Sequence, residues 1–345
     1  MQYSRLRRGM AATATSILFA LTGSAAAHAA TAAVTVTGDD NNPVALAAGT
    51  ATPIRNMSPT VGVGFADKNG YFTLSVAGPD GVSVATPLNC YLNDNYTRYL
   101  DYRGNGNYTV TVNNYAKADT SCKSPTSTQT FVFAINGATA IAGPSGPFLR
   151  RSPNSYSTNT LSLPVALNPG ATGYDVQYAA GAVLAPDGSI SGASSAGYVN
   201  STTGMLDLTF SAPGTYTIVA RAKNGQYATP WSTPVTVRVI TPFDLSSVSF
   251  PDSIGPKYTM KGYLRDTQIR GKITLAMARR GAHNRYGKYK SIGSVHVSSK
   301  GTFTKSFKQK RTGYYRIRIH FAGSSIAPAT TVYGRVHITR RVVYR

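Results

Sequence analysis

Three stretches decide the fold of this chain: Gly106-Asn-Tyr-Thr-Val-Thr-Val112, Gly214-Thr-Tyr-Thr-Ile-Val-Ala220 and Gly313-Tyr-Tyr-Arg-Ile-Arg-Ile319. They share the pattern Gly-x-Tyr-x-[Val/Ile]-x-[small or branched apolar], and their tyrosines, Tyr108, Tyr216 and Tyr315, lie 108 and 99 residues apart. A period of about 100 residues is too long for a solenoid repeat but matches the size of one small domain. The pattern therefore predicts three like modules in a row.

The N-terminus has the features of an export signal. Basic residues (Arg5, Arg7, Arg8) precede an apolar stretch, and small residues follow, ending in Ala27-His28-Ala29. We expect a signal peptide over residues 1–29. No later segment approaches the roughly 20 apolar residues that a membrane span needs, and the chain ends in Arg340-Arg-Val-Val-Tyr-Arg345 without a hydrophobic tail. The sequence predicts a secreted protein that is extracellular or loosely associated with a cell wall.

The composition favours strands. The chain has no Glu, since all 13 acidic residues are Asp, and it is rich in Thr, Val, Tyr, Ser, Asn and Gly, which favour strands and turns over helix interiors. About 316 residues remain after the signal, enough for two or three domains with cores of their own. We predict an all-β protein with modules over residues 30–140, 148–240 and 241–345, and a flexible linker of small residues from Gly137 to Pro147.

Period-two apolar runs recur in each module, as in Phe72-Thr-Leu-Ser-Val76, Leu206-Asp-Leu-Thr-Phe210 and Ile273-Thr-Leu-Ala-Met277. The stretch from Gly214 to Val239 resembles the last two strands of a fibronectin type III domain. The third module resembles the immunoglobulin-like modules of bacterial exported and cell-surface proteins in five motifs: Lys261-Gly-Tyr-Leu264, Gly271-Lys-Ile-Thr-Leu275, Lys288-Tyr-Lys-Ser-Ile-Gly293, Lys300-Gly-Thr-Phe-Thr304 and Arg311-Thr-Gly-Tyr-Tyr-Arg-Ile317. This resemblance implies immunoglobulin-like β-sandwiches, in which a tyrosine near the start of strand F ties the corner to upstream backbone. It implies little about function.

The only two cysteines, Cys90 and Cys122, form an even pair in an exported chain. Such a pair is typical of a disulfide, because exported proteins mature in oxidising surroundings. We expect a bridge that ties the loop after the Tyr108 strand to a strand in the middle of the first module.

The net charge of +22 is unevenly distributed. Residues 31–240 hold 11 basic against 10 acidic residues, whereas residues 241–345 hold 21 basic against 3 acidic. Nearly all of the mature protein's excess positive charge, +18, therefore belongs to the third module. Charge of this density attracts phosphate-rich or sulfated polymers, extracellular DNA or an anionic cell wall.

Alternation predicts where part of this charge points. If Ile317, Ile319 and Val336 face the core, the basic residues between them face outward. The predicted polyanion-binding residues are Arg316, Arg318, His320, Arg335 and His337 on one outer face, Lys272 beside them, and a tyrosine-interleaved basic loop with Arg279, Arg280, Arg285, Lys288 and Lys290. A different reading is that lysines such as Lys305 and Lys308 protect sheet edges from aggregation, or that the charge serves solubility.

The sequence offers little for catalysis or metal binding. The mature histidines His283, His296, His320 and His337 all lie in the third module, among arginines that repel a cation. No nucleophile motif, phosphate-binding loop or paired-carboxylate pattern occurs. We therefore expect a binding, adhesion or structural protein that is not an enzyme and carries no cofactor or metal. The alternative is a spacer or carbohydrate-binding protein that uses a tyrosine platform in the first module: Tyr91, Tyr96, Tyr99 and Tyr102. The sequence leaves the natural ligand, the angles between modules and the oligomeric state open.

Overall fold

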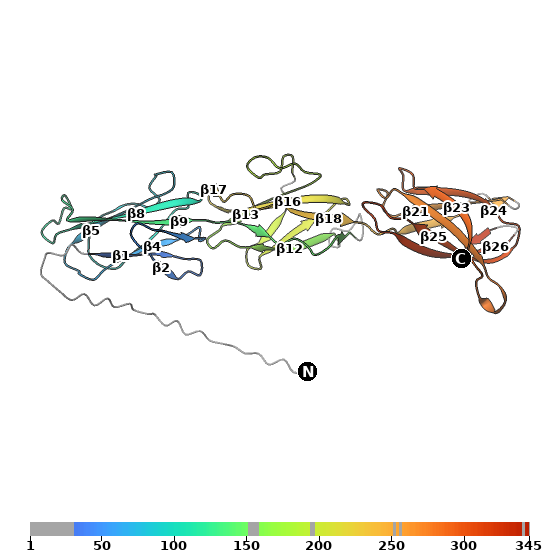
Figure 1. Ribbon diagram of the computed structural model, residues 1–345, viewed down its shortest axis with the longest axis horizontal. Helices are drawn as coiled ribbons and strands as arrows, with labels where there is room; N and C mark the ends of the chain where they lie inside the picture. The colour runs from blue at the N-terminus through green and yellow to red at the C-terminus, as the bar shows by residue number, and fades with distance from the viewer. Residues whose placement is uncertain are drawn as a thin grey trace, which may run out of the picture.

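The computed structural model describes residues 31–150, 159–193, 197–250, 253–254, 257–339 and 342–344. The predicted signal peptide lies outside these residues. The described chain consists of strands, turns and one short 3-10 turn. Figure 1 shows three pairs of sheets that follow one another along the long axis of the molecule. We call them the N-terminal, middle and C-terminal sandwiches.

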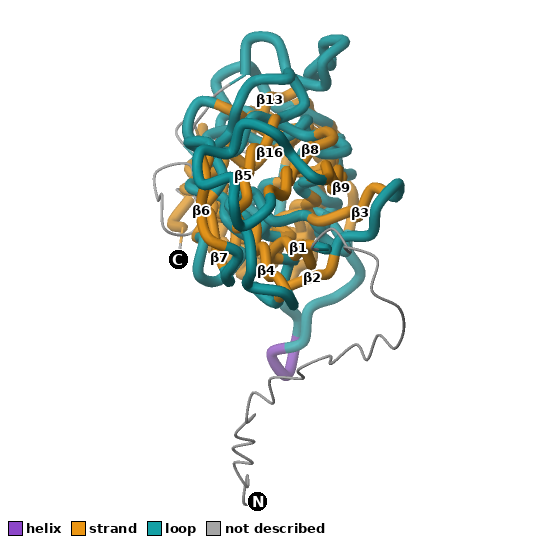
Figure 2. Tube along the Cα trace, turned by 90° about the vertical axis from the view of Figure 1, so that its left-hand side faces the viewer, coloured by secondary structure: helices purple, strands orange, loops and turns teal. Residues whose placement is uncertain are grey.

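The N-terminal sandwich has nine strands in two sheets. The strands are β1 (Ala32–Thr37), β2 (Pro43–Ala45), β3 (Ala51–Ile54), β4 (Thr60–Phe65), β5 (Tyr71–Ala77), β6 (Leu88–Leu92), β7 (Tyr96–Tyr99), β8 (Gly106–Tyr115) and β9 (Ser127–Ile135). One sheet has the order β2-β1-β4-β7 and the other β3-β9-β8-β5-β6, and the end-on view of Figure 2 shows them as two layers. All pairs are antiparallel except β3 with β9. Alternate side chains of both sheets, such as Val61, Phe72 and Phe133, form a common core.

The middle sandwich repeats this plan. Its strands are β10 (Ala140–Ile141), β11 (Phe148–Leu149), β12 (Thr160–Ala166), β13 (Gly173–Ala180), β14 (Tyr198–Asn200), β15 (Met205–Thr209), β16 (Gly214–Asn224), β17 (Tyr227–Ala228) and β18 (Val235–Ile240). The sheets run β10-β12-β15-β14 and β11-β18-β16-β13, with β17 added to β16. Again one strand, β11, pairs in parallel with the last strand, β18. Leu206, Leu208 and Ile218 are buried at the centre of its core.

The C-terminal sandwich carries the excess charge. Its elements are β19 (Leu245–Ser249), β20 (Ser253–Ile254), β21 (Lys257–Leu264), β22 (Lys272–Arg279), the 3-10 turn η1 (Ala282–Asn284), β23 (Lys290–His296), β24 (Thr302–Lys308), β25 (Gly313–Phe321), β26 (Thr330–Ile338) and β27 (Val342–Tyr344). In one sheet β19, β20 and β24 pair with β21, and the other has the order β23-β22-β25-β26-β27. The loop with η1 projects from the sandwich (Figures 1 and 2).

The tyrosine motif has the same role in all three sandwiches. Each motif begins a long central strand (β8, β16 or β25), and each tyrosine hydroxyl donates a hydrogen bond to the carbonyl oxygen four residues earlier: Tyr108 to Gly104 (2.9 Å), Tyr216 to Ala212 (2.9 Å) and Tyr315 to Arg311 (2.8 Å). Burial raises the pKa of Tyr108 and of Tyr216. The repeated bond fixes the corner by which the chain enters this strand.

The segment between the first two sandwiches differs from the predicted flexible linker. Ala140 and Ile141 form β10, which pairs with β12, and Ile141 belongs to the core of the middle sandwich. The preceding residue Gly137 exchanges hydrogen bonds with the side chain of Asn105 (2.7 and 3.2 Å). The first part of this stretch, residues 137–142, therefore occupies hydrogen-bonded positions in place of a free linker.

Further hydrogen bonds join the same two sandwiches. The side-chain amide of Asn224 donates to the carbonyl oxygens of Met57 (2.8 Å) and Gly170 (3.0 Å). Gly170 has a φ of +72°, and a Cβ atom there would lie 2.4 Å from the backbone nitrogen of Ser58. Only glycine fits this junction, because a side chain would have to displace the facing backbone.

A buried ion pair joins the middle and C-terminal sandwiches. The guanidinium of Arg150, which follows β11, contacts the carboxylate of Asp266 in the C-terminal sandwich, and only 1% and 4% of these side chains are exposed. The guanidinium of Arg238 also donates a hydrogen bond to the carbonyl oxygen of Ser325 (2.9 Å). The backbone N–H of Thr241 donates one to the carbonyl oxygen of Ile326 (2.8 Å). The two sandwiches therefore contact each other through side chains and backbone.

Candidate polyanion-binding face

Basic residues gather on the outward side of the sheet β23-β22-β25-β26-β27. Ile317, Ile319 and Val336 are buried in the core, so the residues between them on β25 and β26 lie on the opposite side. We call this outward side the basic face; its predicted members are Lys272 on β22, Arg316, Arg318 and His320 on β25, and Arg335 and His337 on β26. Its arginines lie on two neighbouring strands inside the sheet.

The register places like charges next to each other. Arg316 lies directly opposite Arg335 across β25 and β26, Arg318 lies opposite Tyr333, and Tyr314 opposite His337. Cβ atoms of residues directly opposite in an antiparallel pair are about 4.5–5.5 Å apart, and like charges there are destabilising. The guanidinium groups of Arg316 and Arg335 repel each other in the free protein. An anion bound between them would remove this repulsion and accept hydrogen bonds from both.

Aromatic rings hold the arginine side chains in place. The guanidinium carbon of Arg316 lies 4.3 Å from the centre of the Tyr333 ring, and that of Arg318 lies 4.9 Å from the centre of the Tyr289 ring. A guanidinium stacked on a ring keeps its N–H edges free for two-point contacts with phosphate or sulfate oxygens. The rings also reduce the side-chain entropy that these arginines lose on binding.

A second stack borders a hollow at one end of the basic face. Arg280 lies over the Tyr314 ring (5.5 Å), and Tyr314 stacks on His337 with ring centres 4.0 Å apart. The hollow has a volume of about 450 Å³ and is bounded by Arg280, Asn284, Tyr286, Tyr314, Arg335 and His337. Its lining includes two guanidinium groups, an amide, two phenols and an imidazole, which suit one anionic group of a larger ligand.

The positive charge of this face is not neutralised within the described chain. The described acidic residues of the C-terminal sandwich are Asp244 and Asp266, which pair with Arg265 and Arg150. No lysine or arginine in the described positions from 272 to 339 forms an ion pair. The face therefore presents a positive potential to solvent.

Two of the predicted loop residues, Arg279 and Lys290, lie on strands and have the phase of core-facing positions. Arg279 is the last residue of β22 and pairs with Tyr315, which has its side chain in the core. Lys290 begins the edge strand β23, opposite Met277, and Arg285 and Lys288 lie exposed in the loop between η1 and β23. Among the loop's basic residues, Arg280 is the one that borders the hollow.

Sequence reasoning missed the aromatic partners of the face. Tyr333 was not singled out, although it alternates with Arg335 and His337 along β26, and this period of two could have placed it on the same side. The contact of Tyr333 with Tyr289 (ring centres 6.3 Å apart) could not be predicted. Tyr289 lies just before β23, the strand at the other edge of the sheet.

The histidines lie apart in the structure. His320 Nδ1 forms a 2.9 Å hydrogen bond with Thr331 Oγ1, His337 stacks on Tyr314, and His283 lies in η1. Within the described residues, no three His, Cys, Asp or Glu side chains are close enough to hold a metal ion.

The tyrosines of the alternative carbohydrate site do not form one platform. Tyr102 is 4% exposed, belongs to the core of the N-terminal sandwich, and donates its hydroxyl hydrogen to Asn105 (2.9 Å). Tyr91 and Tyr96 are in ring contact (5.6 Å), while Tyr99 is 82% exposed and lies on the other side of β7. A stacking surface made of all four residues is therefore wrong for this fold.

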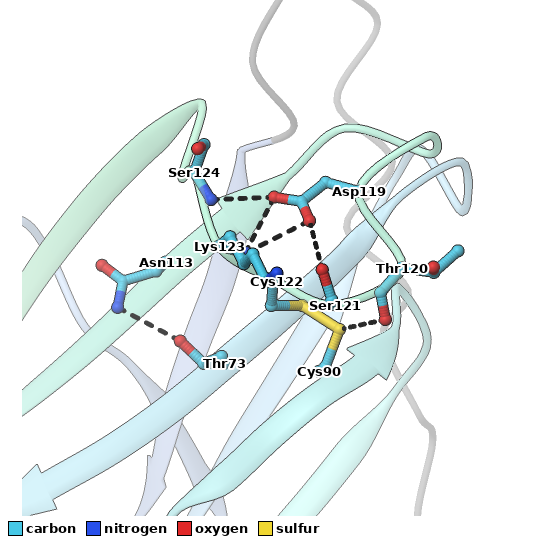
Figure 3. Close-up of a disulfide and its surroundings, with 9 residues drawn as sticks. All are labelled: Thr73, Cys90, Asn113, Asp119, Thr120, Ser121, Cys122, Lys123 and Ser124. Atoms are coloured by element: carbon cyan, nitrogen blue, oxygen red, sulfur yellow. Dashed lines mark hydrogen bonds between the residues drawn. A yellow bond between two sulfur atoms is a disulfide. The ribbon is translucent and has the colours of Figure 1, made fainter.

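The predicted disulfide is confirmed. Cys90 on β6 is bonded to Cys122 in the loop between β8 and β9, with Cα atoms 5.4 Å apart (Figure 3). The carboxylate of Asp119 organises this loop by accepting hydrogen bonds from the backbone N–H groups of Ser124 (2.8 Å) and Lys123 (2.9 Å), which lower the pKa of Asp119. The bridge ties the loop to β6, a strand from the middle of the module, as predicted, and this strand lies at the edge of its sheet.

Replacing both cysteines by alanine is expected to destabilise the N-terminal sandwich by about 3–4 kcal/mol, because the unfolded chain regains the entropy of a loop of this length. In calorimetry of the mature variant, the transition of the N-terminal sandwich should occur at a lower temperature than in the wild type. The wild type under reducing conditions should show the same lowered transition. An unchanged thermogram would contradict a stabilising role for the bridge.

Comparisons with known proteins give structural neighbours only. No family model matches the sequence, and no curated protein matches it. Two fibronectin type III domains of chicken tenascin are 16% identical, cover 58% of this chain and 97% of their own, and have a TM-score of 0.35. A tetra-tandem repeat from the extending region of a large adhesion protein is 11% identical over 90% of this chain and 92% of its own, with a TM-score of 0.32. The FN1-FN3 domains of chicken CNTN1 are 13% identical over 84% and 96%, with a TM-score of 0.22.

Among the described residues, no helix has the length and apolar character to cross a membrane.

The fold class follows from the chain's own sheets. Two packed sheets, a central strand that begins with a tyrosine corner and a last strand beside it recur in each sandwich. This arrangement is that of tandem immunoglobulin-like and fibronectin type III-like β-sandwiches.

Proposed function

We propose that this chain is an exported, non-enzymatic modular binding or adhesion protein, with a signal peptide over residues 1–29 and three modules corresponding to the three sandwiches. The N-terminal and middle sandwiches present the C-terminal sandwich, and its basic face binds a polymer that carries phosphate or sulfate groups. An anionic cell wall, extracellular DNA and a sulfated glycan share this chemistry. The protein acts outside the cell or loosely attached to a cell wall.

The observation that carries the proposal is the pair Arg316 and Arg335. These arginines lie opposite each other on neighbouring strands, one of them over a tyrosine ring, and no carboxylate of the described chain pairs with them. Edge protection does not explain Arg316, because β25 is the central strand of its sheet. Solubility requires dispersed charge, whereas these charges are concentrated beside a hollow.

Retention of the mature chain on immobilised polyanions tests the proposal. We expect binding to heparin resin and to duplex DNA resin at about 50 mM salt and release by about 0.2 M, since several counterions are displaced. Purified cell walls, with and without their phosphate polymers, form the third arm. An uncharged polysaccharide resin is the control. Passage through all the anionic matrices at low salt would contradict the proposal.

A further inference from the structure

Strand β26 of the C-terminal sandwich has a partly uncovered edge. In the three sandwiches β3 pairs with residues 132–135 of β9, β11 with Val239 and Ile240 of β18, and β27 with residues 336–338 of β26. The residues opposite the motif tyrosines are Phe133, Val237 and Val336, so these strands cover corresponding parts of the three edges. Among the described residues, no strand pairs with residues 330–334 on the side away from β25.

The same place in the N-terminal sandwich is closed by a polar side chain. Tyr108 lies opposite Phe133 and Tyr315 opposite Val336, so Gln129 on β9 corresponds to Val332 on β26. The side-chain oxygen of Gln129 accepts a hydrogen bond from the backbone N–H of Ala32 (2.8 Å), the first residue of β1 in the facing sheet. Valine at position 332 cannot make this bond, and the two sheets are left open there.

A groove lies between the two sheets at this position. Its volume is about 410 Å³, and its lining is Leu245, Ser246, Ser247 and Val248 of β19, Ile319 of β25, and Val332, Tyr333 and Gly334 of β26. A strand added beside β26 would lie about 4.8 Å from it and send every second side chain into the groove. The backbone edge and the groove therefore suit one extended segment with alternating apolar residues.

This edge lacks the usual protection against strand addition. The sequence Thr-Thr-Val-Tyr-Gly over residues 330–334 has no charge and no proline, and its β-branched and aromatic residues favour strands. Edges elsewhere in the sandwich carry Lys290 on β23 and Lys308 on β24. Exposed edges are normally blunted by such residues, so their absence here marks an edge that is available for pairing.

We propose that this edge binds an extended acidic segment of a partner protein by strand addition. The acidic character follows from the charge around the edge: Arg335 follows it on β26, Arg316 and Arg318 lie on the next strand, and none of them has a carboxylate partner in the described chain. A second copy of this chain is the less favourable occupant, because pairing two edges would bring together two sandwiches of charge +18 each.

Binding of a short peptide tests this proposal on the full mature chain. The probe is a fluorescent peptide of about seven residues that alternates aspartate and valine, a typical strand length, and its counterpart has lysine for aspartate. We expect the acidic peptide to bind and to slow amide hydrogen exchange at residues 330–334, and the lysine peptide not to bind. Protection at other residues, equal binding of the two peptides, or dimerisation through this edge in solution would overturn the proposal.

A matched pair of variants locates the site. Val332→Lys puts an inward-pointing charge into the groove, and Val295→Lys makes the same change on β23, the opposite edge of the sheet; both valines are half-buried against the same core. We expect V332K to weaken acidic-peptide binding at least about tenfold and V295K to leave it unchanged. Equal loss in both would overturn the proposal. The exchange experiment on the wild type decides the question if V332K does not fold. Heparin retention of V332K should equal that of V295K, which separates this proposal from polyanion binding.

Discussion

The triple variant R316Q/R318Q/R335Q is expected to bind a polyanion about 500-fold more weakly than the wild type at 0.1 M salt. Each lost phosphate contact on duplex DNA removes about 0.9 from the slope of log affinity against log salt, and three lost contacts give this factor. The three side chains lie on the outward side of β25 and β26, so glutamine should leave the core intact. Affinity measured by fluorescence anisotropy on labelled DNA or heparin checks the expectation.

The matched control removes the same charge from the other sheet. Lys257 and Lys261 on β21 and Lys308 on β24 lie on the outer side of the facing sheet, where Lys257 pairs with Lys308. The variant K257Q/K261Q/K308Q should lose at most about tenfold in affinity, through long-range charge alone. Equal losses in the two triple variants would mean that net charge, and not the basic face, determines binding.

Replacing Arg150 by methionine is expected to destabilise the junction of the middle and C-terminal sandwiches by about 3–5 kcal/mol. The change leaves the buried carboxylate of Asp266 without its cation, and the backbone N–H of Gln268 (2.9 Å) is then its described hydrogen-bond donor. Calorimetry of the mature chain should show the transitions of these two sandwiches at lower temperature, with that of the N-terminal sandwich unchanged.

Two further variants make this test specific. Arg265→Met breaks the ion pair with Asp244, in which the side chains are 65% and 52% exposed, and it should cost less than about 1 kcal/mol. The double variant R150M/D266L removes both buried charges and should recover most of the lost stability. If R150M and R265M shift the thermogram equally, the buried pair does not stabilise the junction.

Local sequence patterns predicted the fold because its determinants are local. The period-two runs around Tyr108, Tyr216 and Tyr315 became the long central strands β8, β16 and β25. The cysteine pair became a disulfide, since the chain offers no other partner. Alternation also predicted that Arg316 and Arg335 lie on one side of the sheet; their role in binding remains a prediction.

Features that depend on contacts between distant segments were not predictable. The sequence around Gly137 gave no sign that Asn105, 32 positions earlier, would form hydrogen bonds with Gly137. The pairing of Arg150 with Asp266 spans 116 positions. Composition predicts Arg279 as part of the basic loop, whereas it is the last residue of β22 and has the phase of the buried residues Ile273 and Leu275.

The slope of log affinity against log salt concentration for duplex DNA tests the central claim most directly. Measured for the wild type and for R316Q/R318Q/R335Q between about 50 and 200 mM salt, the slopes should differ by about 2.7, because three phosphate contacts are lost. K257Q/K261Q/K308Q should change the slope by at most about 1. Identical slopes for the wild type and R316Q/R318Q/R335Q would contradict the claim that the arginines of the basic face contact the polymer.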